Sequence, residues 1–522
     1  MAPRLVAAPG ALSAPNHAGP YLTDNATLYV GRIMSVQIKT IGKHTLIYAL
    51  GIMIGKAASF IMLPIYTRYL TPSAYGTLEL LEMTTDVIGM IAGAGIASAV
   101  FKFYADYDTP EERGRVISTA SWAVLSLSLG TAALGFALAP QVTRLVFRTP
   151  TPPAYFRLFF VIYFVQSAAI IPLLYLRALN KSVLFVSLNV GQLVLTLSLN
   201  ILFVVALRLG VRGVLYSSLI AGTASALVVG TYVFRRTGTH FSTPLIRRLI
   251  RFSLPLVLWS LGSFVLTFSD RYFLNYYHGT AVVGLYSLAY QFGFVLAAFA
   301  SRPFSSVWDP QRFEVAKQPD AGEVFRRVFF YMSLVVLFGA FAITVLVRDV
   351  IAVMAAPAFR SAYRVVPILL LTMVLQSWTS YCNIGIYLKH RTRLAAGAAI
   401  IGVVAALGLN LLLIPPFGAF GAAWATVGAF VVRFAVVYVA SQRLYHVDYG
   451  WGRVLRLCLI LAAAYVVHEF VVPDHVLASV SFNLALLAAV SAVVYAGVLD
   501  AAERAFILRS ARRPLALLQS RS

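Results

Sequence analysis

The chain has 522 residues, of which 60% are hydrophobic and only 12% are charged. So few charged side chains cannot cover the surface of a soluble protein, and the composition therefore predicts a protein embedded in a lipid bilayer. The net charge of +23 is explained by basic residues that flank membrane spans, which argues against nucleic acid as a partner. The two cysteines, Cys382 and Cys458, lie in apolar segments, so no disulfide framework is expected.

The N-terminal stretch 1–43 is rich in Ala, Pro and Gly and contains no continuous apolar run. We expect a disordered cytoplasmic tail and not a secretory signal peptide. Met34 directly precedes a sequence typical of the start of a membrane protein, so both Met1 and Met34 are candidate initiation residues.

About 20 apolar residues form a helix long enough to cross a bilayer. By this measure the chain contains about fourteen spans, and the first six form one group, which we call the N-lobe (44–234). Its predicted spans are 44–69, 77–101, 116–138, 154–176, 183–207 and 211–234.

A second group of six spans, the C-lobe (250–441), follows the N-lobe, and two further helices (454–499) and a basic tail (500–522) end the chain. Lys and Arg gather in both tails and in every second connector, which by the positive-inside rule places both termini in the cytoplasm. The predicted C-lobe spans are 250–269, 280–301, 328–347, 362–388, 394–414 and 418–441, and the last two spans are 454–472 and 477–499.

The two lobes share motifs in the same order and at a nearly constant spacing. TRYL at Thr67 to Leu70 recurs as DRYF at Asp270 to Phe273, and LSLNILF at Leu197 to Phe203 recurs as LGLNLLL at Leu407 to Leu413. YLRALNK at 175–181 likewise recurs as YLKHRTR at 387–393, YGTLEL at 75–80 recurs as VGLYSL at 283–288, and the glycine at position 210 returns at position 418. Each lobe has an even number of spans, so we predict an all-α membrane protein built as a parallel internal repeat.

In a duplicated bundle of this kind the functional cavity lies between the halves, and rocking of the halves gives alternating access. The equivalent first helices of the lobes should line that cavity. Glycine and proline within them favour bending, or close helix packing in the case of glycine. The candidate hinge residues are Gly55, Pro64, Pro255 and Gly262.

Charged residues inside spans are costly and need a partner or a watery cavity. Lys56 should lie level with Asp86 on the next helix, and Glu79, Glu82 and Asp86 share one helix face. One interpretation is a buried Lys56–Asp86 ion pair that fixes the two helices. The other is that Lys56 meets an anionic substrate while the acids couple transport to an H⁺ or Na⁺ gradient.

Four arginines complete the proposed cationic cavity. Arg68 and Arg271 are equivalent in the repeat, although interfacial snorkelling explains either one alone. Arg433 lies within a span and has no charged neighbour one turn away, so it is a cavity candidate. Arg302, near a cytoplasmic helix end, fits an interface anchor better than a ligand.

No catalytic, cofactor or metal motif is complete. Gly55-Lys56 lacks the other residues of a phosphate-binding loop, and no Cys/His spacing suits a metal. The outer loops are short, the longest lying near 138–153 and 346–362. We therefore expect a transporter, without a cofactor, and not an enzyme.

Four stretches carry a family resemblance: LPIYTRYLTPSAYGTLELL from Leu63, RFSLPL from Arg251, SDRYFL followed by VGLYSLAYQ, and IPPFGAFGAAWAT from Ile414. With them the chain resembles the polysaccharide biosynthesis proteins, or Wzx-type flippases, of the multidrug/oligosaccharidyl-lipid/polysaccharide exporter superfamily. The resemblance implies two six-helix lobes around a cavity in the bacterial inner membrane. It also implies transfer of a polyprenyl-diphosphate-linked oligosaccharide to the outer leaflet.

Such a flippase serves the synthesis of surface polysaccharide, namely O-antigen, capsule or exopolysaccharide, with membrane lipids and the polymerase and export machinery as expected partners. A lipid II flippase and a cation-coupled multidrug exporter of the same superfamily stay open as alternatives, and a glycan polymerase or ligase fits less well. The predominance of basic residues over acids inside the spans favours an anionic substrate.

Overall fold

The computed structural model describes residues 61–91, 95–148, 151–473, 475–501 and 503–505. Every regular element in these ranges is helical, which confirms the predicted all-α class. Lys56 and Gly55 lie outside the described residues. The bounds of the spans and lobes given above otherwise stay predictions, against which the observed elements are compared below.

The N-lobe elements follow a short helical stretch at 61–69. Two of the N-lobe helices begin at Thr-Pro pairs, where the threonine hydroxyl accepts a backbone N–H and the proline occupies the first turn. Thr71 accepts from the Ala74 N–H at 3.1 Å, and Thr109 accepts from the Glu112 N–H at 3.3 Å. The elements are α2 Pro72–Gly89, α3 Gly95–Ala105, α4 Pro110–Ala137, α5 Ala139–Val146, α6 Pro153–Ala178, α7 Ser182–Asn200, η2 Ile201–Ala206 and α8 Val211–Thr237.

The C-lobe begins with α9, which at 36 residues is longer than the predicted span and reaches both lobes. Its first half packs on α3 and α4, and its second half packs on α10 and α15. The elements are α9 Thr243–His278, α10 Thr280–Leu296, η3 Ala297–Ser301, α11 Arg302–Val315, α12 Ala321–Met354, η4 Pro357–Val365, α13 Val366–Cys382, α14 Ile384–Leu388 and α15 Thr392–Leu444, followed by α16 Trp451–Val471 and α17 Val476–Gly497.

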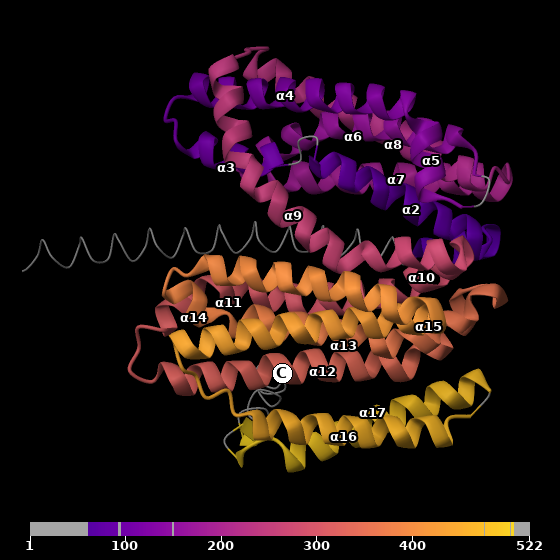
Figure 1. Ribbon diagram of the computed structural model, residues 1–522, viewed down its shortest axis with the longest axis vertical. Coiled ribbons are helices and arrows are strands. Elements are labelled where there is room, and N and C mark those ends of the chain that lie inside the picture. Colours follow the sequence, from indigo (N-terminus) through magenta and orange to yellow (C-terminus); the bar gives the residue numbers. More distant parts are fainter. Residues whose placement is uncertain (1–60, 92–94, 149–150, 474, 502, 506–522) are drawn as a thin grey trace, which may run out of the picture.

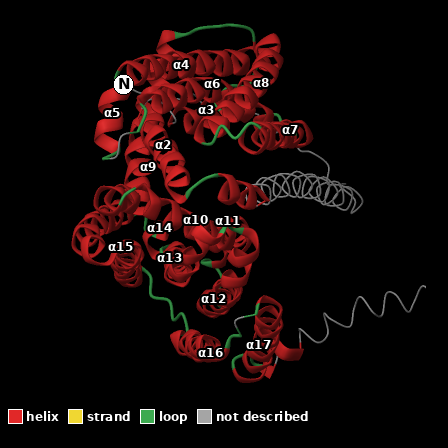
Figure 2. Cartoon of the chain, turned by 90° about the vertical axis from the view of Figure 1, so that its right-hand side faces the viewer, coloured by secondary structure: helices red, strands yellow, loops and turns green. Residues whose placement is uncertain are grey.

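Figure 1 shows the two lobes one above the other, with the N-lobe helices in indigo to magenta at the top and the C-lobe helices in orange below. Helix α9 runs obliquely from one lobe to the other. Helices α16 and α17, in yellow, lie on the far side of the C-lobe, and the side view in Figure 2 shows the same order. They contact α12 and each other.

Eleven helices within the described ranges are long and apolar enough to cross a membrane. One of them, α15, has 53 residues and turns at Gly418, where φ is +56°. The backbone at Gly418 is not helical, so α15 consists of two helices that meet at a kink, and these match the two predicted spans 394–414 and 418–441. The two longest predicted outer loops contain the short helices α5 and η4, which the search for long apolar runs could not detect.

Equivalent positions of the predicted repeat adopt matching backbone conformations. Gly210 and Gly418 have φ/ψ of 57°/−131° and 56°/−128°. The side chains of Asn200 and Asn410 also match, because each donates to the first helix of its own lobe, at 2.9 Å to Tyr66 Oη and 3.2 Å to Ser269 Oγ. These pairs support the repeat through features that the sequence motifs alone do not contain.

Candidate functional site

The lobes meet where α2 crosses α10, and the crossing is formed by two buried glycines. A Cβ atom added at Gly76 would lie 2.0 Å from the Thr280 carbonyl oxygen, and one added at Gly284 would lie 2.1 Å from that of Pro72. Only a hydrogen side chain fits at either position, so the two backbones are in direct contact. Gly76 and Gly284 occupy equivalent places in the predicted repeat, which makes the crossing nearly symmetric.

Polar and aromatic contacts surround this crossing, and we call the whole set the outer interface. The positive-inside rule assigns this end of the lobes to the outside. Its contacts hold N-lobe residues against α9, α10 and η4. They are Ser73 Oγ with Thr280 Oγ1 at 2.6 Å, Thr84 Oγ1 with Tyr272 Oη at 3.0 Å, Asn275 Nδ2 donating to the Val146 carbonyl at 2.5 Å, Arg148 over the Tyr276 ring at 3.6 Å, and the edge-to-face rings of Tyr75 and Phe359.

A buried ion pair lies directly behind the outer interface. Arg271 Nη1 contacts Asp270 Oδ1 at 2.9 Å, and the two side chains are 1% and 2% exposed. Asp270 Oδ2 accepts from the Tyr286 hydroxyl at 2.6 Å and from the Thr426 hydroxyl at 3.1 Å. The Arg271 guanidinium lies 4.2 Å from the centre of the Tyr290 ring. The charges of both partners are thereby compensated inside the fold.

This placement differs from the open cationic cavity suggested for Arg271 by the sequence. In the conformation described here the Arg271 side chain is enclosed and bound to its neighbour in the chain. Asp270 was missed as a partner because adjacent residues on a helix do not usually face each other. The only sequence signal was the adjacency of the two opposite charges within an apolar span.

One of the three carboxylates of α2 lies beside this pair. Glu79 is half-buried and interacts electrostatically with Arg271 across the lobe boundary. Glu82 and Asp86 are exposed on the same helix. The predicted acidic face therefore exists, and one of its members reaches the C-lobe charge pair. The predicted contact of Asp86 with Lys56 lies outside the described residues and stays a prediction.

The other predicted cations occupy three different environments. Arg433 is half-buried on α15, and its Nε is buried without a hydrogen-bond partner among the described residues. Its side chain lies against Gly402, where an added Cβ would be 3.2 Å from that of Arg433. Arg68 is exposed beside the outer interface, whereas Arg302 is exposed at the start of α11. These arginines are therefore not gathered into one cluster.

The candidate hinges are placed as follows. Pro64 lies in the helical stretch 61–69, and Pro255 is exposed within α9 near its passage between the lobes. Gly262, also on α9, has no atom within 4 Å of an added Cβ. Close packing therefore does not explain Gly262. In the described ranges no group of three or more His, Cys, Asp or Glu side chains is arranged to hold a metal ion.

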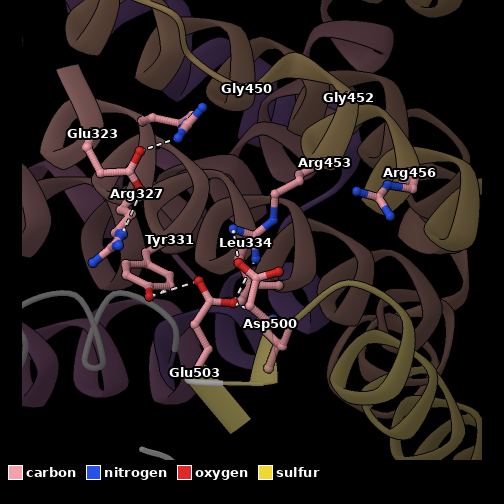
Figure 3. Close-up of a pocket in the computed structure, with 12 residues that line it drawn as sticks. Glu323, Arg327, Tyr331, Leu334, Gly450, Gly452, Arg453, Arg456, Asp500 and Glu503 are labelled. Atoms are coloured by element: carbon pink, nitrogen blue, oxygen red, sulfur yellow. Dashed lines mark hydrogen bonds and ion pairs between the residues drawn. The ribbon is translucent and has the colours of Figure 1, made fainter.

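A second charged cluster, which sequence reasoning missed, joins α12, α16 and the segment after α17 (Figure 3). It surrounds a pocket of about 990 Å³ at the end of the helices assigned to the cytoplasm. Arg453 contacts Asp500 at 3.1 Å and Glu503 at 2.7 Å and covers the Phe330 ring at 4.0 Å. The Tyr331 hydroxyl donates to Glu503 at 3.0 Å. The cluster thus attaches the C-terminal segment to the C-lobe.

Arg453→Gln is expected to release this segment. The change removes two ion pairs of a partly buried guanidinium, so we expect a loss of about 1 to 2 kcal/mol of local stability. Limited proteolysis of inside-out vesicles should then cleave the C-terminal segment faster. Arg456→Gln is the matched control, because Arg456 lies one turn further along α16 and has no ion pair among the described residues. Equal cleavage of both variants would contradict the role assigned to Arg453.

The attachment should also weaken in acid. Burial raises the pKa of Glu503, but hydrogen bonds from Arg453, the Asp500 N–H and Tyr331 outweigh it and lower the pKa below its usual range. A lowered folded-state pKa contributes stability that is present at neutral pH and is lost as the pH falls through the lowered value. Proteolysis of the segment should therefore accelerate on the acid side of that pKa.

Comparisons with known proteins agree with this architecture. A family model described as polysaccharide biosynthesis protein matches residues 41–316. No curated protein matches the sequence. Among solved structures, the lipid II flippase MurJ in an inward closed conformation has a TM-score of 0.69 at 11% identity, covering 86% of this chain and 99% of MurJ.

Two transporters of the MOP superfamily are also similar. An inward-facing multidrug resistance MATE family transporter has a TM-score of 0.60 at 17% identity, covering 74% of this chain and 94% of its own. A Pyrococcus furiosus transporter, described as having a binding pocket of reverse polarity, has a TM-score of 0.52 at 16% identity, with coverages of 77% and 95%. At these identities the similarity shows a shared fold.

Proposed function

This chain belongs to the polysaccharide biosynthesis protein family, whose model spans more than half of it, and we propose that it is a flippase for a lipid-linked oligosaccharide. The substrate is a polyprenyl-diphosphate carrying an oligosaccharide repeat unit, moved from the cytoplasmic to the outer leaflet of the bacterial inner membrane. The product serves surface polysaccharide synthesis. No covalent chemistry is required for this transfer.

The outer interface is the observation that best supports this proposal. The lobes are joined there through glycine backbones, hydrogen bonds between hydroxyl groups, and buried apolar side chains from both lobes, among them Leu80 and Val283. Such a contact is closed in one state and separable in another, as alternating access requires. In this conformation it blocks the outer end, so substrate enters from the cytoplasmic side.

The diphosphate is recognised by cations inside the bundle. Arg433 is the best placed of the described candidates, because its buried Nε lacks a hydrogen-bond partner and it has no ion pair in the described ranges. A guanidinium pairs with phosphate oxygens in a bidentate geometry. Lys56 and Arg68 are proposed to assist at other stages, and Arg302 at the cytoplasmic rim, whereas Arg271 is held by Asp270 and is left out of this set.

Arg433→Met is expected to lower transport by about 10- to 100-fold, because one charge-assisted hydrogen bond to the substrate is worth about 1.5 to 3 kcal/mol. Methionine preserves much of the apolar stem. The readout is the initial rate of glycan transfer in proteoliposomes at equal protein density. Arg443→Met is the control, since Arg443 is exposed at the end of the same helix. Normal transport by the Arg433 variant would show that Arg433 does not bind the substrate.

Energy for the return step is proposed to come from an H⁺ or Na⁺ gradient acting on the acidic face of α2. Glu82 and Asp86 are exposed, and Glu79 links that face electrostatically to Arg271 in the other lobe. Binding of a cation at this face would alter the attraction between the lobes. No resident cofactor is part of the proposal.

Leaflet-resolved transport tests the function directly. Purified protein in proteoliposomes should move a defined polyprenyl-diphosphate glycan from one leaflet to the other, measured by the access of an externally added glycan-cleaving enzyme. Lipid II and a cationic drug are run as alternative substrates, because the similar structures are named as a lipid II flippase and a multidrug transporter. Transfer of either one in place of the glycan would overturn the substrate assignment.

The enzyme alternative is tested in the same vesicles. A polymerase or ligase would create longer or newly linked glycans, whereas the proposed flippase returns the substrate chemically unchanged. In the cell, we expect the chain to work beside a polysaccharide polymerase and the export machinery, with both termini in the cytoplasm. If the purified protein formed new glycosidic linkages, it would be an enzyme and the flippase proposal would be wrong.

A further inference from the structure

A second polar pocket lies on the opposite end of the C-lobe from the Arg453 cluster. It has a volume of about 270 Å³ and is enclosed by α12, η4, the start of α13, α15 near its bend, and α16. Its lining includes Arg348, Arg364, Tyr363, Tyr465 and His468. It is separate from the boundary between the lobes and plays no part in the transport path proposed above.

His468 is the most unusual residue of this pocket. Its side chain is only 4% exposed, yet neither ring nitrogen makes a hydrogen bond of normal geometry within the described part of the chain. The Val345 carbonyl, which accepts from Asn483 Nδ2 at 2.9 Å, lies near the ring but outside hydrogen-bond geometry. The ring stacks on Tyr465 with an interplanar angle of 16°. A buried imidazole with two unpaired nitrogens is costly unless a ligand or water pairs with it.

The other polar groups of the pocket are mainly cationic. Arg348 is half-buried on α12, and Arg364 is exposed on η4 without an ion pair among the described residues. Among the described residues, Glu469 is the acid that lines the pocket; its side chain is 56% exposed and lies 3.9 Å from His468 Nδ1. The Arg364 guanidinium, which has no ion pair in the described ranges, and the His468 imidazole favour an anionic ligand.

The depth of the pocket suggests where that anion comes from. His468 lies three residues before the end of α16, and Arg348 lies six residues before the end of α12. At about 1.5 Å of rise per residue, both side chains lie within about 10 Å of the helix ends. This is the depth of lipid headgroups. The volume has room for a phosphate group together with part of its ester.

We propose that the pocket between α12, η4 and α16 binds a phosphate group, presented either by an outer-leaflet lipid headgroup or by a free phosphate anion. Arg364 contacts the phosphate oxygens from the rim. His468 donates a hydrogen bond from the inner wall. Occupancy would join η4 to α16 and so attach the two C-terminal helices to the C-lobe on its outer side.

Binding of inorganic phosphate and inorganic diphosphate to the full-length protein in neutral detergent tests the free-anion source. Isothermal titration should show saturable binding that Arg364→Gln weakens at least tenfold. Arg360→Gln is the matched control, because Arg360 lies on the same exposed helix but does not line the pocket. His468→Asn should also weaken binding, provided that its unfolding transition stays cooperative.

Native mass spectrometry tests the lipid source. Protein released from nanodiscs of phosphatidylcholine with added phosphatidylglycerol should retain the anionic lipid, and Arg364→Gln should lose it while Arg360→Gln keeps it. Selective binding in either experiment supports the site and identifies its ligand. If neither probe binds, or if the two arginine variants weaken binding equally, the pocket holds only water and the proposal fails. Neither experiment depends on transport activity.

Discussion

A protein carrying Ser73→Cys and Thr280→Cys is expected to lose transport completely once the two thiols are oxidised, and to recover it on reduction. The Ser73 and Thr280 hydroxyl oxygens lie 2.6 Å apart, which brings the two side chains within reach of a disulfide. The bond would join α2 to α10 across the lobe boundary. Because the proposed cycle requires these helices to separate, a covalent link should stop it at this point.

The matching control places the same bond inside one lobe. Ser301 Oγ and Ser377 Oγ lie 2.8 Å apart, and both residues belong to the C-lobe. Oxidised Ser301→Cys/Ser377→Cys protein should therefore keep its activity if the lobes move as rigid bodies. The native Cys382 and Cys458, which are both free, are first replaced. Undiminished transport by the oxidised interlobe pair would mean that the outer interface does not open during the cycle.

The second large effect is expected from Asp270→Ala, which leaves the Arg271 charge buried and uncompensated. Removing one partner of a buried ion pair costs about 3 to 5 kcal/mol, and the change also removes the acceptor of the Tyr286 and Thr426 hydroxyls. Thermal unfolding in detergent should show this loss. The double variant Asp270→Asn/Arg271→Met should recover part of the stability, because it leaves no buried charge.

A surface ion pair provides the comparison. Glu314 and Lys317 lie 2.8 Å apart, but their side chains are 73% and 70% exposed. Glu314→Ala should therefore change stability by less than about 1 kcal/mol. If Asp270→Ala behaved like this surface variant, the Asp270–Arg271 pair would have to be solvated in the native protein, and the compact outer end described above would be wrong.

The sequence predicted those features that depend on local pattern. Apolar length located the spans, and the acidic face of α2 followed from the spacing of Glu79, Glu82 and Asp86. The isolation of Arg433 from charged neighbours along its own helix agrees with its lack of an ion pair in the described ranges. In each case residues within a few turns of one another carry the information.

Features that depend on tertiary contacts could not be predicted in this way. Arg453 is bound by Glu503, fifty residues further along the chain. The Asp270 carboxylate likewise accepts hydrogen bonds from hydroxyl groups on α10 and α15. The glycines at positions 76 and 284 resemble many other glycines in apolar helices until the opposing backbone is seen. The extra length of α9 was missed because its basic first turns do not form an apolar run.

The continuity of α9 between the lobes limits how they can move. Since this helix is unbroken from Thr243 to His278, any rotation of one lobe against the other must be absorbed as curvature along α9 or at its ends. Pro255 has no N–H, so the carbonyl of Arg251, four residues earlier, makes no helical hydrogen bond that bending could break. Bending at Pro255 therefore breaks no main-chain hydrogen bond. This matters within a membrane, because few groups there could replace a broken hydrogen bond. The lobes can thus tilt with little enthalpic penalty while their connection stays intact.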